Sequence, residues 1–129
     1  MEEKVVEQLF IITNNPLSKK NFSSQYEVIF IEGPVEKVYT MVRDKIHLGH
    51  KLLTHPLMSS IKPNETPYRT ICLSVKRVKG TDMDSVLLIE NSIMTLKKFL
   101  NISPLPKYTE SVLNDFQLID YDLINHALN

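Results

Sequence analysis

The sequence has little cysteine, little glycine and no excess of charge of either sign. Its 129 residues include one cysteine, three glycines, and fifteen basic residues against fifteen acidic ones. The single cysteine, Cys72, excludes an internal disulfide. Because the three glycines stand singly, neither a dinucleotide fingerprint nor a phosphate-binding P-loop can be written. The balanced charge gives no global field that would draw nucleic acid or anionic lipid to the protein.

Long apolar runs are also absent. No stretch approaches the roughly 20 apolar residues that span a bilayer, and Met1 to Glu7 lack the basic-then-apolar order of a signal peptide. A cytoplasmic protein with no membrane and no nucleic-acid partner is therefore expected. The length predicts a single domain over residues 1–129, large enough to bury roughly two thirds of its unfolded surface.

What the sequence does contain is an alternation of strand and helix patterns. Leu9–Ile12 and Val28–Ile31 are short apolar runs, which are typical of central strands buried on both faces of a sheet. Between them Asn15 and Pro16 can begin a short crossover helix. Leu52 and Leu53 fit a short third strand, and residues 69–76 alternate as an edge or half-covered strand does.

Three further segments have helical spacing. One helix is predicted from Val35 to about Gly49. The second follows a loose capping box at residues 81–84, and its apolar stripe comprises Val86, Ile89, Ile93, Leu96 and Leu100. The third begins after Thr109 as N-cap and runs to about His126, with a predicted buried face of Val112, Phe116, Ile119, Leu123 and Ala127. Together these elements predict an α/β fold: a single three-layer domain with a small mixed sheet, Rossmann-like in character, and two C-terminal helices.

A polar segment over residues 47–69 is the strongest candidate for a functional region. It gathers three of the four histidines and three of the seven prolines. In open α/β sheets ligands lie outside the carboxyl ends of the strands, and residues 13–15 and 54–56 leave predicted strands there. The side chains expected to share a ligand-binding site are Thr13, Asn14, Asn15, His50, Thr54, His55, Lys62, Asn64, Glu65, Tyr68 and Arg69.

Two interpretations of this segment remain open. As an anion site, it offers donors from His55, Lys62 and Arg69, and arginine can clasp a carboxylate or phosphate with two hydrogen bonds. Otherwise Asn64 and the prolines shape turns, and the charges are solvated. A transition-metal site of His47, His50, His55 and Glu65 has unspecific spacing, so no metal is predicted. No cofactor is identified.

Two classes of function follow. The first is a binding protein for a small anionic metabolite or a protein partner. The second is a small hydrolase or transferase that uses His50 or His55 as general acid or base. We favour the first class, because no nucleophile or orienting carboxylate is placed beside either histidine. Cys72 on an alternating strand is more often a packed residue than a nucleophile.

The chain also resembles a known family. Residues 49–57 and 61–68, preceded by Thr13-Asn-Asn-Pro16, are similar in order and spacing to the GrdX family, a resemblance that covers roughly residues 8–100. These small proteins are encoded beside the selenium-dependent glycine reductase system of amino-acid-fermenting anaerobes. The resemblance implies an accessory role near glycine, sarcosine or betaine reductase, with a metabolite or a reductase component as partner. The sequence also leaves open whether the protein forms a homo-oligomer, in which Tyr39, Phe99 or Tyr121 could lie at the interface.

Overall fold

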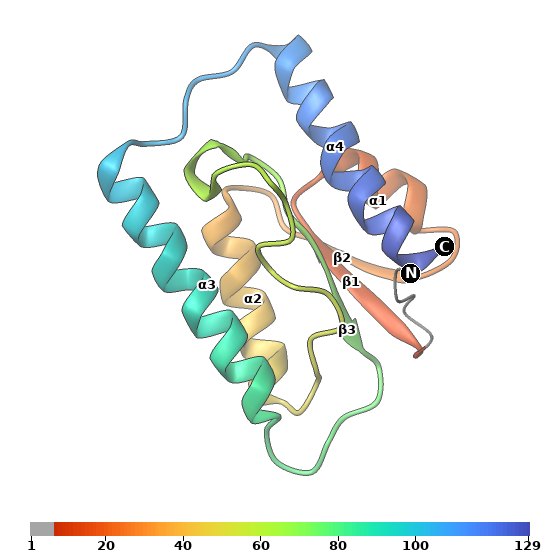
Figure 1. The fold of residues 1–129 in the computed structure, drawn as a ribbon. Coiled ribbons are helices and arrows are strands. Elements are labelled where there is room, and N and C mark those ends of the chain that lie inside the picture. The colour runs from red at the N-terminus through yellow and green to blue at the C-terminus, as the bar shows by residue number, and fades with distance from the viewer. Residues whose placement is uncertain (1–6) are drawn as a thin grey trace.

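The computed structural model describes residues 7–129. The prediction about the N-terminal segment therefore lies, apart from Glu7, outside the described residues. In chain order the elements are β1 (Leu9–Thr13), α1 (Pro16–Phe22), β2 (Glu27–Phe30), α2 (Val35–His47), the short 3-10 helix η1 (Pro63–Glu65), β3 (Thr70–Ser74), α3 (Met83–Ile102) and α4 (Glu110–Leu128) (Figure 1). The predicted α/β class with two C-terminal helices is confirmed.

The three strands form one mixed sheet in the order β2-β1-β3. β1 pairs with β2 in parallel and with β3 antiparallel, so Thr13 lies opposite both Phe30 and Thr70. The carboxyl ends of β1 and β2 and the start of β3 therefore lie at the same end of the sheet. A three-stranded sheet does not establish a Rossmann-like fold, and that part of the expectation stays a prediction.

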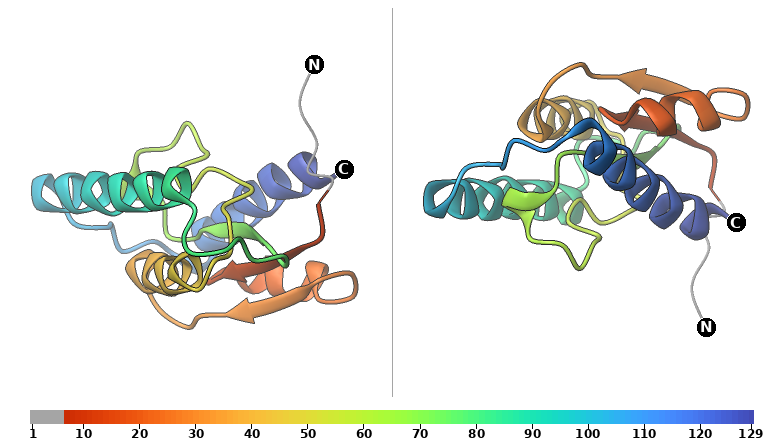
Figure 2. Two further views of the ribbon diagram at one scale, coloured as in Figure 1. Left: turned by 90° about the horizontal axis from the view of Figure 1, so that it is seen from below. Right: turned by 90° about the horizontal axis from the view of Figure 1, so that it is seen from above.

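Helices cover both faces of the sheet, as the three-layer prediction requires. Successive side chains of a strand point to opposite faces. Phe10 and Ile12 pack with α2 and α3, whereas Leu9 and Ile11 pack with Phe22 of α1 and Ile124 of α4. Figure 2 shows α2 and α3 running beside each other. Tyr39 is buried in the α2 side of the core, while Phe99 and Tyr121 are half-buried.

The strand predictions need three corrections. β1 is buried throughout and central, but β2 is an edge strand with Glu27 exposed, because only β1 pairs with it within the described chain. Leu52 forms an isolated bridge with Leu73 and no third strand. β3 was expected to be an edge or half-covered strand; it does lie at an edge of the sheet, but it is not half-covered, since all five of its residues are buried. Its polar face is covered because α4 brings a polar side chain, Asp120, onto Thr70.

The predicted helix ends are largely correct. Asn15 caps α1, its side chain accepting a hydrogen bond from the Leu17 N–H. α2 ends just before Gly49, whose φ of +107° suits the residue that follows a helix. The apolar stripe of α3 faces the core as predicted. Its N-cap, however, is Asp82 and not Thr81, because the Asp82 carboxylate reaches the Ser85 N–H.

The predicted buried face of α4 was correct only in part, since Phe116, Leu123 and Ala127 are half-buried. Thr109 caps the helix as expected, but Val112 and Ile119 are 37% and 47% exposed. The residues that α4 buries most completely are Asp120 and Ile124. A search for an apolar stripe misses the centre of this face, since it is an acidic side chain whose partners lie 50 and 105 residues away in the sequence.

Candidate functional site

The predicted residues at the strand ends form a buried hydrogen-bond network. The Thr13 hydroxyl lies 2.8 Å from both the Arg69 carbonyl oxygen and the Thr70 hydroxyl. Asn14 joins the neighbouring loops: its amide donates to the carbonyls of Gly33 and Pro67, and its Oδ1 accepts from the Arg69 N–H at 2.9 Å. These contacts hold the start of β3 against the end of β1, so they primarily stabilise the fold.

Asp120 completes this network from α4. Its Oδ2 accepts hydrogen bonds from the Thr70 hydroxyl at 2.6 Å and from Asn15 Nδ2 at 2.9 Å. Burial raises the pKa of the Asp120 carboxyl above its ordinary value, while these two hydrogen bonds and the nearby Arg69 charge act in the opposite direction. The carboxyl therefore binds a proton more tightly than a solvated aspartate does.

Arg69 lies beneath α4 and not at the surface. Its residue is 4% exposed, and its Nε is buried without a hydrogen-bond partner. Burial raises the pKa of Tyr39, and the Arg69 guanidinium opposes that rise. The cavity between Arg69, Asp120 and Thr66 has a volume of about 10 Å³, which is room for about one water molecule. A metabolite does not fit there, so in this conformation Arg69 is not available to a solvent-borne anion.

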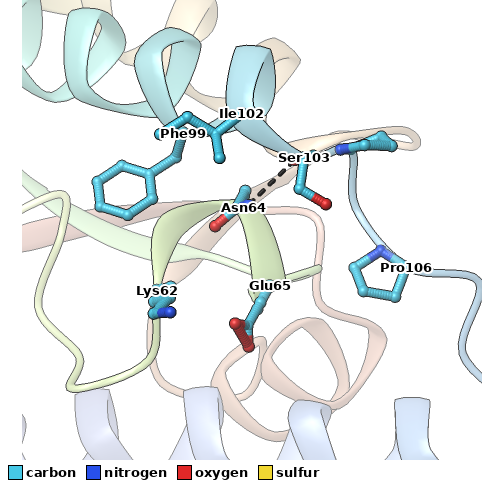
Figure 3. Close-up of a pocket in the computed structure, with 8 residues that line it drawn as sticks. Lys62, Asn64, Glu65, Phe99, Ile102, Ser103 and Pro106 are labelled. Carbon is cyan, nitrogen blue, oxygen red and sulfur yellow. Dashed lines mark hydrogen bonds between the residues drawn. The ribbon is translucent and has the colours of Figure 1, made fainter.

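Three other predicted residues line a larger surface pocket beside the C-terminal end of α3. This pocket, which we call the α3-end pocket, has a volume of about 310 Å³. Figure 3 shows Lys62, Asn64 and Glu65 on one side of it and residues of α3 and the following connector on the other. Its lining residues are Lys62, Asn64, Glu65, Phe99, Ile102, Ser103, Pro104 and Pro106.

The walls of the α3-end pocket are held together by hydrogen bonds. Asn64 Nδ2 donates to the Ser103 carbonyl at 3.0 Å, while Asn64 Oδ1 is buried and has no partner. The Tyr108 hydroxyl donates to the backbone carbonyl of Glu65 at 2.7 Å. The Thr66 hydroxyl donates to the Lys62 carbonyl at 3.0 Å. The backbone that carries Lys62 and Glu65 is therefore fixed against α3 and the connector.

Neither of the two candidate catalytic histidines lines this pocket. His50 Nδ1 hydrogen-bonds the Ser74 carbonyl at 2.7 Å, and its ring packs edge-on against Phe10. Ser74 and Thr70 are at opposite ends of β3, a separation of roughly 13 Å at about 3.3 Å per residue. His55 is exposed, and its Nδ1 accepts a hydrogen bond from the Leu57 N–H at 3.0 Å.

The remaining predicted residues have structural partners. Thr54 is buried, and its hydroxyl accepts from the Cys72 N–H at 3.0 Å. The Tyr68 hydroxyl accepts from Gln117 Nε2 at 3.3 Å. The structure thus places four of the eleven predicted residues in the buried network and three on the α3-end pocket, while His50, His55, Thr54 and Tyr68 have other partners.

Comparison with known protein families decides the identity of the chain at family level. The GrdX-like protein family matches residues 10–129, essentially the whole sequence. The chain belongs to the GrdX-like protein family. No curated protein and no solved structure matches it. The family match extends beyond the region of recognised resemblance, residues 8–100, and includes α4.

Two features were searched for among the described residues of this GrdX-like chain: a metal-binding cluster and a membrane-spanning helix. Among residues 7–129 no group of three or more histidine, cysteine, aspartate or glutamate side chains is placed to hold a metal ion. In the same range no helix is long and apolar enough to cross a membrane. His47 lies in the last turn of α2.

Sequence reasoning missed two groups of residues in this GrdX-like chain. Ser18, Thr70 and Asp120 belong to the buried network, and Phe99 and Ser103 line the α3-end pocket. For Asp120 a signal was present: Phe116, Asp120 and Ile124 follow each other at four-residue spacing, which places an acidic residue within an apolar stripe. Nothing in the local sequence connects Ser103 with Asn64.

Proposed function

We propose that this protein is an accessory protein of the glycine reductase system that binds a small amino acid in the α3-end pocket. The observation that carries the proposal is that Lys62 and Glu65, which carry opposite charges, both line one pocket of about 310 Å³. Pockets for small molecules commonly begin at about 300 Å³. Membership of the GrdX-like family supports the association with the reductase system.

Each part of a zwitterionic amino acid has a counterpart in the pocket. The Lys62 ammonium suits the ligand carboxylate, because a charge-assisted hydrogen bond is among the stronger polar contacts. Glu65 suits the ligand ammonium, and so does the C-terminal end of α3, where the helix dipole is negative. The Phe99 ring and the prolines provide apolar area for a short side chain or for N-methyl groups.

The competing enzymatic function receives less support from the geometry. A general acid or base must lie within hydrogen-bonding reach of the reacting group. His50 and His55 do not line the α3-end pocket, and the Nδ1 of each already has a backbone partner. We therefore propose binding, and not catalysis, as the role of the pocket.

Calorimetric titration with three related probes tests the proposal. Glycine carries both charges, acetate lacks the ammonium and methylamine lacks the carboxylate. Glycine is expected to bind more tightly than either fragment. The free energy of binding of so small a ligand is bounded by about 1.5 kcal/mol for each heavy atom. A dissociation constant in the millimolar range would therefore already support the proposal. Sarcosine and betaine, titrated in parallel, report whether the apolar wall accepts N-methyl groups.

Two variants of the α3-end pocket test which group of the ligand Lys62 and Glu65 each bind. Glu65→Gln is expected to weaken glycine binding about tenfold, the size of one lost charged hydrogen bond, and to leave acetate binding unchanged. Lys62→Gln is expected to weaken both. Lys107→Gln is the matched control, because Lys107 lies on the same connector but does not line the pocket. Equal weakening in all three variants, or acetate binding as tight as glycine, would contradict the proposal.

Association with the reductase system needs its own experiment. The tagged chain, expressed in an amino-acid-fermenting host, is expected to co-purify with reductase components. Recovery of these components at the level of an untagged control would count against the association. It would not affect the test of amino-acid binding, which depends only on the titrations of the pocket.

A further inference from the structure

A second pocket lies at the other end of the molecule, in the turn between β3 and α3. It has a volume of about 510 Å³ and is lined by Lys51, Lys76, Arg77, Val78, Lys79 and Glu7. We call it the basic pocket. The turn from β3 to α3 lies at the opposite end of α3 from the connector that borders the α3-end pocket (Figure 1). The two pockets are therefore separate sites.

The charge in the basic pocket is strongly one-sided, although the chain as a whole is neutral. Four of the fifteen basic residues line it, against one acidic residue. Glu7 pairs with Lys51 at 3.7 Å. Within residues 7–129, Lys76, Arg77 and Lys79 form no ion pair. Three positive charges in one concave surface raise the local concentration of anions.

The backbone that carries these charges is fixed. The Val78 N–H donates to the Gly49 carbonyl at 2.8 Å, and the Ser74 hydroxyl donates to the Lys76 carbonyl at 2.7 Å. Gly49 approaches this turn so closely that an added Cβ would lie 2.8 Å from the Val78 oxygen. A fixed backbone lowers the entropy cost of assembling several cations around one ligand.

We propose that the basic pocket binds a small anion that carries a diphosphate group. Three cations that form no ion pair within residues 7–129 match several negative charges better than one. The arginine adds bidentate recognition of phosphate oxygens. Single-stranded nucleic acid is disfavoured, because such sites stack bases on aromatic side chains and no aromatic residue lines this pocket. The size suits a small molecule.

Titration of the full chain with pyrophosphate at low salt tests the assignment. Pyrophosphate is expected to bind more tightly than inorganic phosphate, and ADP is expected to match pyrophosphate because the diphosphate group carries the recognition. ADP binding that is much tighter than pyrophosphate binding would overturn the assignment, since it would require a site for the nucleoside. A single-stranded oligonucleotide that binds more tightly than pyrophosphate would also overturn it.

Two charge-matched double variants decide whether the pocket is responsible. Lys76→Gln with Lys79→Gln is expected to weaken pyrophosphate binding at least about tenfold. Lys97→Gln with Lys98→Gln removes the same charge from the exposed face of α3 and is expected to leave binding unchanged. Equal weakening in both variants, or no binding to the unaltered chain at millimolar pyrophosphate, refutes the site. All four substitutions are at exposed positions, and thermal melts verify folding.

Discussion

Asp120 is the side chain that ties α4 to the rest of the fold, so Asp120→Ala is the most informative perturbation of stability. One of its hydrogen bonds comes from Asn15, the N-cap of α1, and the other from Thr70, the first residue of β3. These are the two elements on which α4 mainly packs. The variant therefore removes a link to both elements in a single step.

The expected cost follows from these contacts. A hydrogen bond to a charged group contributes about 1.5 to 3 kcal/mol, and a neutral one about 0.5 to 1.5 kcal/mol. Burial raises the pKa of the Asp120 carboxyl, so desolvation of its charged form opposes folding. We therefore take about 1.5 kcal/mol, the value where the two ranges meet, for each bond. Their loss is expected to lower the free energy of unfolding by about 3 kcal/mol.

Urea denaturation monitored by circular dichroism measures this cost. Asp122→Ala is the matched control, since Asp122 is exposed two residues further along the same helix; it is expected to change stability by no more than about 0.5 kcal/mol. If Asp120→Ala destabilises the protein by less than about 1 kcal/mol more than the control does, the structural role assigned to the network is refuted.

Three further predictions concern pH, backbone strain and thiol reactivity. Because the pKa of Asp120 is raised, the part of its contribution to stability that depends on protonation is complete below pH 3.8 and is lost as pH rises through the folded-state value. The stability of the wild type relative to Asp120→Asn should therefore fall over that window, and a rise would contradict the raised pKa. Gly49→Ala should cost about 1 to 3 kcal/mol in urea denaturation, and more than Gly80→Ala, since an added Cβ meets the Val78 oxygen only at Gly49; equal costs would contradict that contact. Burial raises the pKa of Cys72 to about 12, so a chromogenic disulfide reagent should react only when the protein unfolds, and rapid reaction with the native protein would contradict this.

The parts of the fold that local patterns determine could be predicted from the sequence. β1 is an apolar run of central-strand type, and α2 combines helical spacing with a glycine just beyond its end, so both were predicted closely. The order of elements then followed. Edge position could not be predicted in the same way. The run Val28–Ile31 is as continuously apolar as Leu9–Ile12, so the sequence pattern did not distinguish an edge strand from a central one; the strand order does.

The candidate site was predicted less completely, because long-range contacts decide it. Thr13 and Arg69 do meet at the strand ends. Arg69 nevertheless faces α4 and not solvent, which depends on how α4 is rotated about its axis. Lys62 and Glu65 were identified from composition alone, whereas their pocket exists only because the end of α3 lies beside them. Sequence reasoning therefore found the segment but not the surface that completes it.

The most direct test of the proposed function is a titration of the ¹⁵N-labelled chain with glycine, followed in a proton–nitrogen correlation spectrum. The account predicts that the largest shifts occur at the Asn64 side-chain amide and at the backbone amides of Glu65 and Ser103, because these groups border the α3-end pocket. No shift at these three residues under millimolar glycine, or shifts confined to residues 76–79, would contradict the account.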